Sequence, residues 1–440
     1  MDTPIYNFLK EYDASGTLRC HMPGHKGREI FPDGLSSLLD ITEIAGADSL
    51  FEASGIIRQS ELGMSKLYGS ADTFYSAAGS TLCIQAMLAA MKQEGRTVIA
   101  VRNVHRSFLN AAALLDLDVE WVMPDYTDGI LSGIIRPEDI ELLLAKIPNT
   151  CVYLTSPDYT GRMADIQGIA LVCKKYGAPL LVDNAHGAHL HFLPVSHHPI
   201  SLGADMCCDS AHKMLPALTG AAMLHTASEK YAGVLRQCMS LFASSSPSYL
   251  ILASLDLCGR YISEHIRKDI ELNLSYIQEL KRVFSGRLVF SQGDPFHITI
   301  KAAESGFDGN ELADLLQKHG AECEYADHGL LVLLMSPMNT EEDYKRLIDA
   351  LDETLKNVKV SEPHTDDIKL SLPEKEMSIR QAVFSPSEEI SVDEAEGRIC
   401  ASVKVPCPPA VPIVASGEII DRDCINIFKR YGISTVNVVY

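Results

Sequence analysis

Short apolar runs that alternate with helical patterns constrain the fold of this chain more than any other feature. The runs are Thr97–Val101, Val119–Met123, Cys151–Thr155, Pro179–Val182, Met206–Cys208 and Ala221–Leu224. Helical spacing lies between several of them; Ile84, Met87, Leu88 and Met91 keep the i, i+3, i+4, i+7 pattern. Apolar strands that alternate with helices form a mostly parallel sheet with both faces covered. The sequence therefore predicts an α/β fold.

The 440 residues exceed one ordinary domain, and the chain changes character along its length. We expect an N-terminal arm, a large domain, a small α+β domain, a polar linker and a C-terminal domain at residues 1–35, 36–265, 266–358, 359–376 and 377–440. In the small domain we expect strands at 297–303 and 329–335 and helices at 309–319 and 341–356. In the C-terminal domain, SVDEAEGRICA (391–401) is helix-like, and PCPPAVPIVASGEII (406–420) is too rich in proline for a central strand.

Composition and charge exclude several classes of protein. The net charge of −20 is unsuited to binding nucleic acid, which requires clustered Lys and Arg. It is compatible with a cationic substrate, although a role in solubility is the more common explanation. No apolar run approaches the roughly 20 residues that span a bilayer, and no signal peptide begins the chain. The 12 cysteines include no C-x-x-C pair, so neither a disulfide framework nor a zinc motif is expected. We expect a cytoplasmic protein.

Small and hydroxyl residues precede the first helix of the α/β unit. Gly79, Ser80 and Thr81 open a helical stretch predicted at 82–94. Free backbone N–H groups and hydroxyls at a helix start suit a phosphate group. Taken alone, an ordinary helix cap without a ligand is the more common explanation of these residues.

Three more polar residues follow the predicted strands. Asp183 is either a turn residue or a partner for a protonated heteroaromatic nitrogen. His105 is either a polar loop residue or a flat ring that stacks on a cofactor. Lys213 is either an exposed lysine at a helix start or a partly desolvated amine, whose lowered pKa makes it a nucleophile.

The histidines after Asp183 raise the question of a metal. His186, His189 and His191 follow one another at i, i+3 and i+5 just after a strand, which is not a standard ligand spacing. We therefore expect no metal site there.

Together these residues match the needs of one cofactor. Pyridoxal phosphate requires a phosphate cradle, an acidic group at the pyridine nitrogen and a lysine for the aldehyde carbon. Ser80, Asp183 and Lys213 supply such groups at the strand ends of one α/β unit, where open parallel sheets bind ligands.

The sequence resembles the Orn/Lys/Arg decarboxylase family of fold-type-I pyridoxal-phosphate enzymes. The resemblance rests on blocks in family order from HMPGHKG near the N-terminus to YGISTVNVV at the C-terminus, including VRNVHRSF, LVDNAHGAHLHF, CCDSAHKMLPALTG and DPFHITI. It implies an aspartate-aminotransferase-like large domain, pyridoxal 5′-phosphate as the cofactor and an amino acid as the substrate. It also implies a homodimer with shared active sites, and possible higher assemblies, with no nucleic-acid or membrane partner.

The resemblance also implies roles for individual residues. Lys213 would be the lysine that binds the cofactor, and His212 would lie near the substrate carboxylate. Asp183 would pair with the pyridine nitrogen. The other cofactor-binding residues implied are His105 on the ring, Gly79, Ser80, Thr81 and Ser210 at the phosphate, Ala185 and His186 at the ring face, and Thr219 from the partner subunit.

Departures from the family pattern concern neighbours of these groups. Ala211, Gly220 and Asn184 stand where many members have threonine, glutamine and glutamate. None of them removes a group that the chemistry requires. Because the chain starts at the arm, without the extra N-terminal domain of longer members, large ring-like assemblies are not expected.

The resemblance implies α-decarboxylation of arginine, lysine or ornithine in polyamine biosynthesis. An aminotransferase and a non-catalytic regulatory relative are the alternatives; the absence of arginine between Leu288 and Lys345 favours decarboxylation. Four acidic residues of the small domain either meet a cationic substrate or, as we expect for most, are ordinary surface charges: Asp294, Glu322, Glu324 and Asp327.

Overall fold

The structure, a computed structural model, describes residues 14–20, 26, 48–365, 370–402 and 411–440. Most of the expected N-terminal arm (1–35), including nearly all of HMPGHKG, and the start of the proline-rich segment lie outside the described residues. Among those that are described, no helix is both long and apolar enough to cross a membrane.

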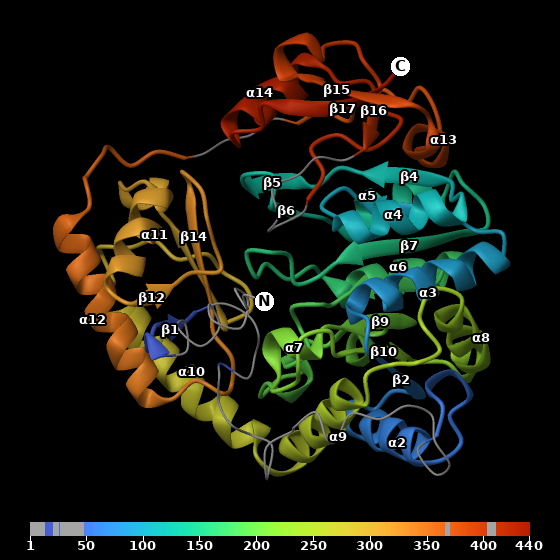
Figure 1. Ribbon diagram of the computed structural model, residues 1–440, viewed down its shortest axis with the longest axis horizontal. Helices are drawn as coiled ribbons and strands as arrows, with labels where there is room; N and C mark the ends of the chain where they lie inside the picture. The colour runs from blue at the N-terminus through green and yellow to red at the C-terminus, as the bar shows by residue number, and fades with distance from the viewer. Residues whose placement is uncertain (1–13, 21–25, 27–47, 366–369, 403–410) are drawn as a thin grey trace, which may run out of the picture.

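A seven-stranded sheet forms the centre of the large domain (Figure 1). Its order is β2 (Asp72–Ser76), β10 (Ala222–Thr226), β9 (Met206–Asp209), β8 (Leu180–Asp183), β7 (Thr150–Thr155), β3 (Thr97–Val101) and β4 (Val119–Val122). The strands from β9 to β4 pair in parallel, and β10 is antiparallel to both neighbours. This mostly parallel sheet confirms the predicted α/β class.

Alternating side chains of each strand pack on opposite faces of this sheet. Val98 and Ala100 of β3 lie in one apolar cluster, whereas Ile99 and Val101 lie in another. The first cluster is covered by α3 (Gly79–Gln93), α4 (Arg106–Leu115) and α8 (Glu229–Ser240). The second is covered by α5 (Pro137–Leu144) and α6 (Ile166–Tyr176). Strands buried on both faces explain why the apolar runs are nearly continuous.

Strand β2 is the one strand of this sheet that the apolar runs do not reveal. Its sequence, DTFYS, is largely polar, yet all five residues are buried. Asp72 accepts two hydrogen bonds from Arg58, at 2.7 and 2.9 Å, and Thr73 Oγ1 lies 2.8 Å from His225 Nδ1. The polar residues of β2 thus find hydrogen-bond partners in the folded protein. Because they are polar, the strand cannot be recognised in the sequence as an apolar run.

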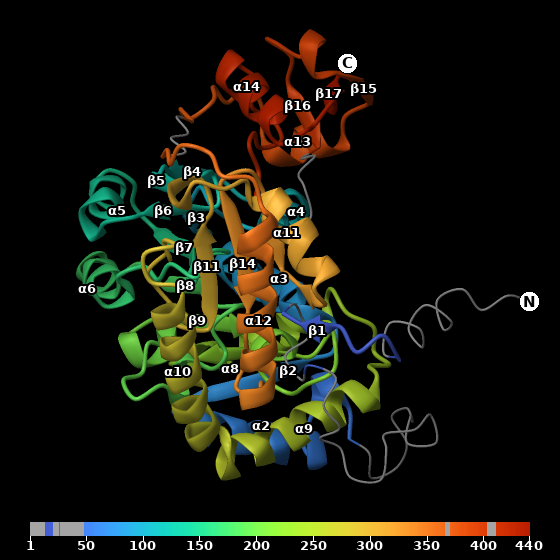
Figure 2. The same ribbon diagram turned by 90° about the vertical axis from the view of Figure 1, so that its left-hand side faces the viewer.

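A small domain lies beside the carboxyl ends of the large sheet (Figures 1 and 2). Three helices border the large domain: α2 (Ile56–Tyr68), α9 (Tyr249–Glu264) and α10 (Ile266–Val283). Of these, α9 and α10 lead the chain from the large domain into the small one. Its own elements are β11 (His297–Lys301), β13 (Tyr325–Ala326), β14 (Leu330–Leu334), α11 (Gly309–Lys318), α12 (Glu341–Asn357), and β1 (Leu18–Arg19) paired with β12 (Ala321–Glu322). The strands and helices expected in this region are therefore present, with ends that differ by a few residues.

The C-terminal part contains a three-stranded sheet and two helices next to α4 and β4 (Figure 1). Its elements are α13 (Ile379–Phe384), β15 (Ser387–Ser391), β16 (Cys400–Ser402), α14 (Arg422–Arg430) and β17 (Thr435–Val439). The helix expected at 391–401 was wrong. Only a 3-10 turn, Val392–Glu394, forms there before the chain enters β16, because Gly397 adopts a positive φ of 79°.

A buried ion pair holds the C-terminal part against the large domain. Arg102, at the end of β3, donates to both carboxylate oxygens of Glu418 at 2.9 and 2.6 Å. Both side chains are buried, and Glu418 also accepts from the backbone N–H of Ala415 at 2.7 Å. A bidentate pair of this kind fixes the relative position of the two segments and also pairs their charges. It keeps the segment that begins at residue 411 beside the strand ends.

Candidate active site

A cavity lies at the carboxyl ends of the parallel strands, where this fold class binds ligands. Six of the residues predicted from the sequence line it: Ser80, His105, Asp183, Ala185, His186 and Lys213. Six others complete the lining: Asn103, Leu131, Thr155, Pro157, Tyr159 and Val411. The sequence thus locates one half of the cavity, and loops from elsewhere in the chain supply the other half.

The remaining predicted site residues are not part of the lining of this cavity. Gly79 begins α3 with a φ of 71°, and Thr81 in the first turn is exposed. Ser210 is buried next to the short helix α7 (Ala211–Met214), on which His212 is half-buried. Thr219 is exposed in the loop that follows.

Lys213 is held by a histidine of the neighbouring strand end. Its Nζ lies 2.8 Å from Nε2 of His186, and Nδ1 of His186 lies 3.2 Å from Nε2 of His297. His297 is the first residue of β11, so the small domain contacts the Lys213 site through this ring. Nδ1 of His297 in turn lies 2.7 Å from Oδ2 of Asp294.

Asp294 closes this chain of hydrogen bonds with a second histidine. Its Oδ1 lies 2.8 Å from Nε2 of His189. Surface charges were expected for most of the four acidic residues named in the sequence, but Asp294 is not one, since it is only 2% exposed. Burial opposes its ionisation, but His189 and His297 lower its pKa below the usual range. Asp294 is thus a buried carboxylate held between two imidazoles.

The chain has one self-consistent direction of hydrogen bonds. Burial, followed by the charge of Lys213, lowers the pKa of His186 well below 6.5, so its ring is neutral with one donor and one acceptor nitrogen. Because a lysine ammonium only donates, Nε2 of His186 accepts and its Nδ1–H donates to Nε2 of His297. Nδ1–H of His297 then donates to Asp294. The carboxylate therefore fixes both tautomers.

The aspartate of β8 lies deeper in the same cavity. Burial raises the pKa of Asp183, whereas the charge of Lys213 lowers it. Its Oδ1 accepts from the backbone N–H of Ala185 at 3.2 Å, and the hydroxyl of Tyr153 lies 3.4 Å from Oδ2. A buried carboxylate with few hydrogen bonds is suited to a positively charged partner.

Two further histidines are kept neutral. His105 caps α4: its Nδ1 accepts from the backbone N–H of Ser107 at 3.2 Å, so Nε2 carries the proton. His212 donates through Nδ1 to the carbonyl of Ala221 at 2.9 Å. Burial lowers the pKa of each ring to about 4. Uncharged, His105 presents a flat ring to the cavity.

The three departures noted in the sequence have structural counterparts. Asn184 donates through Nδ2 to Asp209 at 2.7 Å, behind the cavity. Ala211 is fully buried. Gly220 has a φ of 96°, and its carbonyl accepts from Gly79 N–H at 2.8 Å, which ties this loop to the start of α3. A side chain at position 220 would be strained.

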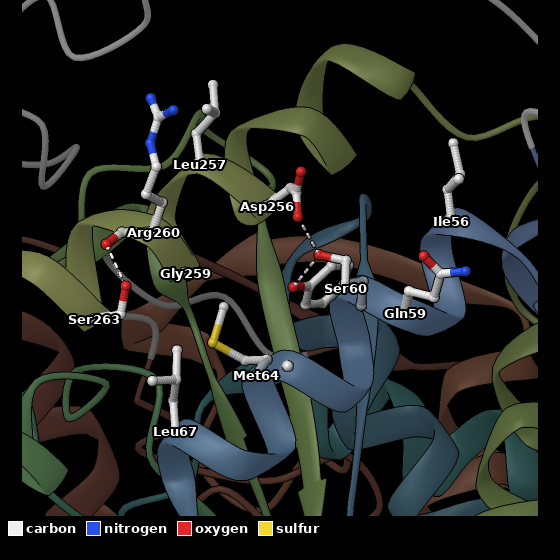
Figure 3. Close-up of a pocket in the computed structure, with 12 residues that line it drawn as sticks. Ile56, Gln59, Ser60, Met64, Leu67, Asp256, Leu257, Gly259, Arg260 and Ser263 are labelled. Atoms are coloured by element: carbon white, nitrogen blue, oxygen red, sulfur yellow. Dashed lines mark hydrogen bonds between the residues drawn. The ribbon is translucent and has the colours of Figure 1, made fainter.

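An open groove elsewhere on the molecule carries no such chemistry. It lies between α2 and α9, where Ser60 points toward Asp256 (Figure 3). The Ser60 hydroxyl donates to Asp256 at 2.6 Å and lies 2.9 Å from the hydroxyl of Tyr75, so these polar groups satisfy one another. Among the described residues, neither a lysine nor a histidine lines this groove. The strand-end cavity is thus the better candidate for the active site.

Comparisons with known proteins identify the family to which the chain belongs. Residues 3–302 match the family model for the major domain of Orn/Lys/Arg decarboxylases, and residues 364–431 match the model for their C-terminal domain. The chain belongs to the Orn/Lys/Arg decarboxylase family. It is accordingly a pyridoxal-phosphate-dependent decarboxylase, a lyase.

Relatives of this decarboxylase extend over nearly its whole length. Two Bacillus subtilis (strain 168) proteins each cover 98% of the chain and are covered to 94%: the uncharacterized protein YaaO at 30% identity and an arginine decarboxylase at 29%. Lysine decarboxylase A from Pseudomonas aeruginosa has the same fold, with a TM-score of 0.76 at 17% identity. That alignment covers 91% of this chain and 73% of the Pseudomonas protein.

The cavity of this decarboxylase fits its cofactor. Ser210 Oγ and Thr155 Oγ1 are buried and have no hydrogen-bond partner among the described residues. Buried hydroxyls of this kind require an acceptor or donor, and phosphate or ring oxygens supply one. Asp183 likewise lacks a cationic partner in direct contact within the described chain. Sequence analysis missed His297, which is marked only as a histidine opening an apolar strand in DPFHITI, and it considered Asp294 only as a contact for a cationic substrate or a surface charge.

Proposed function

We propose that this enzyme removes the α-carboxylate of a basic L-amino acid as CO₂ and releases the corresponding amine for polyamine formation. Arginine is the first substrate to test, and lysine and ornithine are the alternatives. The observation that carries the proposal is Lys213 at the end of a buried hydrogen-bond chain, in a cavity that also contains Asp183 and His105. Support for arginine comes from the Bacillus relatives that bear this activity in their names.

In this proposal each residue has a defined task. When bound, pyridoxal phosphate supplies an electron sink for the electron pair left at Cα. Asp183 keeps a proton on the ring nitrogen, and Lys213 Nζ holds the cofactor and later gives a proton to Cα. Nε2 of His186 accepts a hydrogen bond from Lys213 Nζ. This contact directs the other protons of Nζ into the cavity.

His297 and Asp294 are positioning residues in this scheme. They do not line the cavity, and they act by holding His186 in the tautomer whose Nε2 accepts. The wrong tautomer would turn a second donor toward the Lys213 ammonium. The predicted result of losing Asp294 is therefore a loss of catalytic rate together with an altered pH profile.

The absence of arginine in the described cavity lining supports decarboxylation rather than transamination. An arginine would clamp the α-carboxylate, which has to leave. Arg346, an alternative clamp, instead donates to the carbonyl of Gly16. Family membership likewise decides against an aminotransferase and against a non-catalytic relative.

We assign recognition of the cationic side chain to Tyr159 and Glu324. Tyr159 lines the cavity, and its hydroxyl donates to Glu324 at 2.8 Å. Glu324 is half-buried at this rim, so its carboxylate attracts a guanidinium or ammonium group more strongly than it would in water. For Glu324→Gln we expect KM for the basic substrate to rise about tenfold, with a smaller change in kcat.

The test of the proposal is release of CO₂ and amine from arginine, lysine and ornithine, each supplied separately to the cofactor-loaded enzyme. We expect equimolar CO₂ and amine from one of the three. Formation of a keto acid without CO₂, or turnover of none of these substrates, would contradict the proposal.

Assembly is a further part of the proposal. Thr219 is exposed and outside the cavity, so a role at the phosphate requires a second copy of the chain. We therefore expect a homodimer, with Thr219 of each copy near the cavity of the other. Sedimentation velocity tests this; a monomer that is fully active would contradict it.

A further inference from the structure

A second group of histidines lies behind the central sheet, apart from the cavity. Its members are Cys207 and Asp209 on β9, His225 on β10 and His198 just before the 3-10 helix η4 (Pro199–Leu202). All four are buried. Cys207 and Asp209 alternate to the same face of β9, and His225 lies directly across from Cys207 in the antiparallel register. Cys208 points to the opposite face, toward Asp183.

The potential ligand atoms of His198, Cys207 and Asp209 lie close together, and that of His225 lies next to Asp209. Asp209 Oδ2 lies 3.0 Å from His198 Nε2 and 3.4 Å from His225 Nε2. Cys207 Sγ lies 3.8 Å from His198 Nε2, and the donor atoms of His198, Cys207 and Asp209 all lie within 4.8 Å of one another. Bonds of about 2.0 to 2.3 Å to a tetrahedral metal place ligand atoms roughly 3.3 to 3.8 Å apart. Three ligand atoms are thus close enough to share one metal ion, and His225 Nε2 lies beside them, 3.4 Å from Asp209 Oδ2.

The surroundings of the group are also those of a metal site. The second oxygen of Asp209 accepts from Asn184 at 2.7 Å, and Nδ1 of His225 lies 2.8 Å from the Thr73 hydroxyl. Such outer contacts orient ligands in known sites. Nε2 of His225 points at Asp209 but makes no hydrogen bond within the described residues. A buried ring nitrogen that lies 3.4 Å from a carboxylate without forming a hydrogen bond is free to coordinate an ion in this group.

We propose that His198, Cys207, Asp209 and His225 bind one structural zinc ion. Two imidazole nitrogens, one thiolate and one carboxylate oxygen form a donor set typical of Zn²⁺. On binding, the Cys207 thiol gives its proton to solvent, and both histidines coordinate as neutral rings through Nε2. The four ligands occupy all tetrahedral positions, so no place is left for a substrate or a catalytic water.

The ion would link three segments next to the active site. It would connect β9, β10 and the loop before η4, and Asp209 immediately precedes Ser210 and the α7 helix that bears Lys213. Tyr68 covers this region from α2, with its ring 5.1 Å from that of His198 and 4.5 Å from that of His225. Since the group is sealed from solvent, we expect loading during folding and slow loss to chelators.

The test is elemental analysis of the full chain, produced in zinc-supplemented medium and washed with a chelator to strip surface ions. We expect one zinc per chain. A second preparation from cobalt-supplemented medium should show the long-wavelength visible bands of tetrahedral Co²⁺ with a thiolate ligand. Chelator-washed protein with no stoichiometric zinc and no cobalt bands would overturn the proposal and leave a hydrogen-bonded cluster.

Two variants separate a site from chance metal binding. Cys207→Ser should abolish the cobalt–thiolate absorbance and greatly reduce retained zinc. Cys173→Ser is the matched control, because Cys173 is also buried but lies on α6 and is not one of the proposed ligands. Equal zinc and cobalt signals in the two variants would overturn the assignment. Should Cys207→Ser fail to fold, the metal content of the unaltered chain decides alone.

Discussion

The large and small domains meet at one aspartate between two histidines, and a similar arrangement lies behind the sheet. Asp294 contacts His189 and His297, and Asp209 lies between His198 and His225. Both carboxylates are buried, and in both burial is outweighed by the flanking histidines, which lower the pKa below the usual range. The two groups are therefore almost alike in composition and electrostatics.

They differ in what they connect. The Asp294 group spans two domains and continues through His186 to Lys213 at a cavity. The Asp209 group stays within the large domain and ends at the Cys207 thiol, away from that cavity. The same residue types thus favour a positioning role in one place and metal binding in the other. Connectivity, rather than residue type, distinguishes them.

The largest effect is expected when the Asp294 group is interrupted at Lys213, its end in the cavity. In Lys213→Ala, decarboxylation should fall by about a thousandfold or more, and the yellow absorbance of the bound cofactor should be lost, because no amine remains to hold it. CO₂ release and a visible spectrum measure both. Lys175→Ala, which removes an exposed lysine paired with Glu141, is the control and should behave like the wild type. Substantial turnover by Lys213→Ala would contradict the account.

Breaking the same group at its far end should have the next largest effect. Asp294→Asn leaves the shape intact but no longer fixes the His297 and His186 tautomers, so kcat should fall by about a hundredfold and its pH profile should shift. Asp308→Asn is the matched control: Asp308 also pairs with a histidine, His328, at 2.6 Å, but at the surface. Steady-state rates across pH distinguish them. Identical profiles would show that Asp294 is only structural.

The approach of the two domains can be tested at Gly161. A Cβ there would lie 2.4 Å from Cβ of His297, and φ is 90°. Gly161→Ala should therefore displace His297, lowering both Tm and kcat. Gly177→Ala is the control, because it has a φ of 65° with nothing within 4 Å and carries only the backbone strain of about 1 kcal/mol. Equal kcat values in both variants would place His297 outside the mechanism.

The smallest effect expected is on stability against pH. His105 and His212 have folded-state pKa values of about 4, lowered from 6.5 chiefly by burial. Between pH 4 and pH 6.5 the unfolded chain binds more protons than the folded chain. The contribution of the two neutral rings to the free energy of unfolding is therefore complete above pH 6.5 and is lost as pH falls toward 4. Tm should decline across this window, and less steeply in the double variant His105→Gln, His212→Gln. Parallel curves for both proteins would argue against buried neutral rings.

The sequence predicted those parts of the molecule that depend on local pattern. Apolar runs located most strands of the central sheet, and polar residues after them located Lys213, Asp183 and His105 at one cavity, although their roles stay predictions. It missed what folding brings from elsewhere. Val411 enters the lining through the C-terminal part. The sequence could not distinguish Asp294 from surface charges, since its burial arises only where the domains meet.

The central claim is that Lys213 binds the cofactor. Borohydride reduction of the loaded enzyme, followed by peptide mapping with mass spectrometry, tests it most directly. We predict one pyridoxyl-phosphate group per chain, on the peptide that contains Lys213. Another lysine offers a fair comparison: Lys26 is also buried, and burial lowers its pKa to about 8. Label on Lys26 in place of Lys213, or no label at all, would contradict the account.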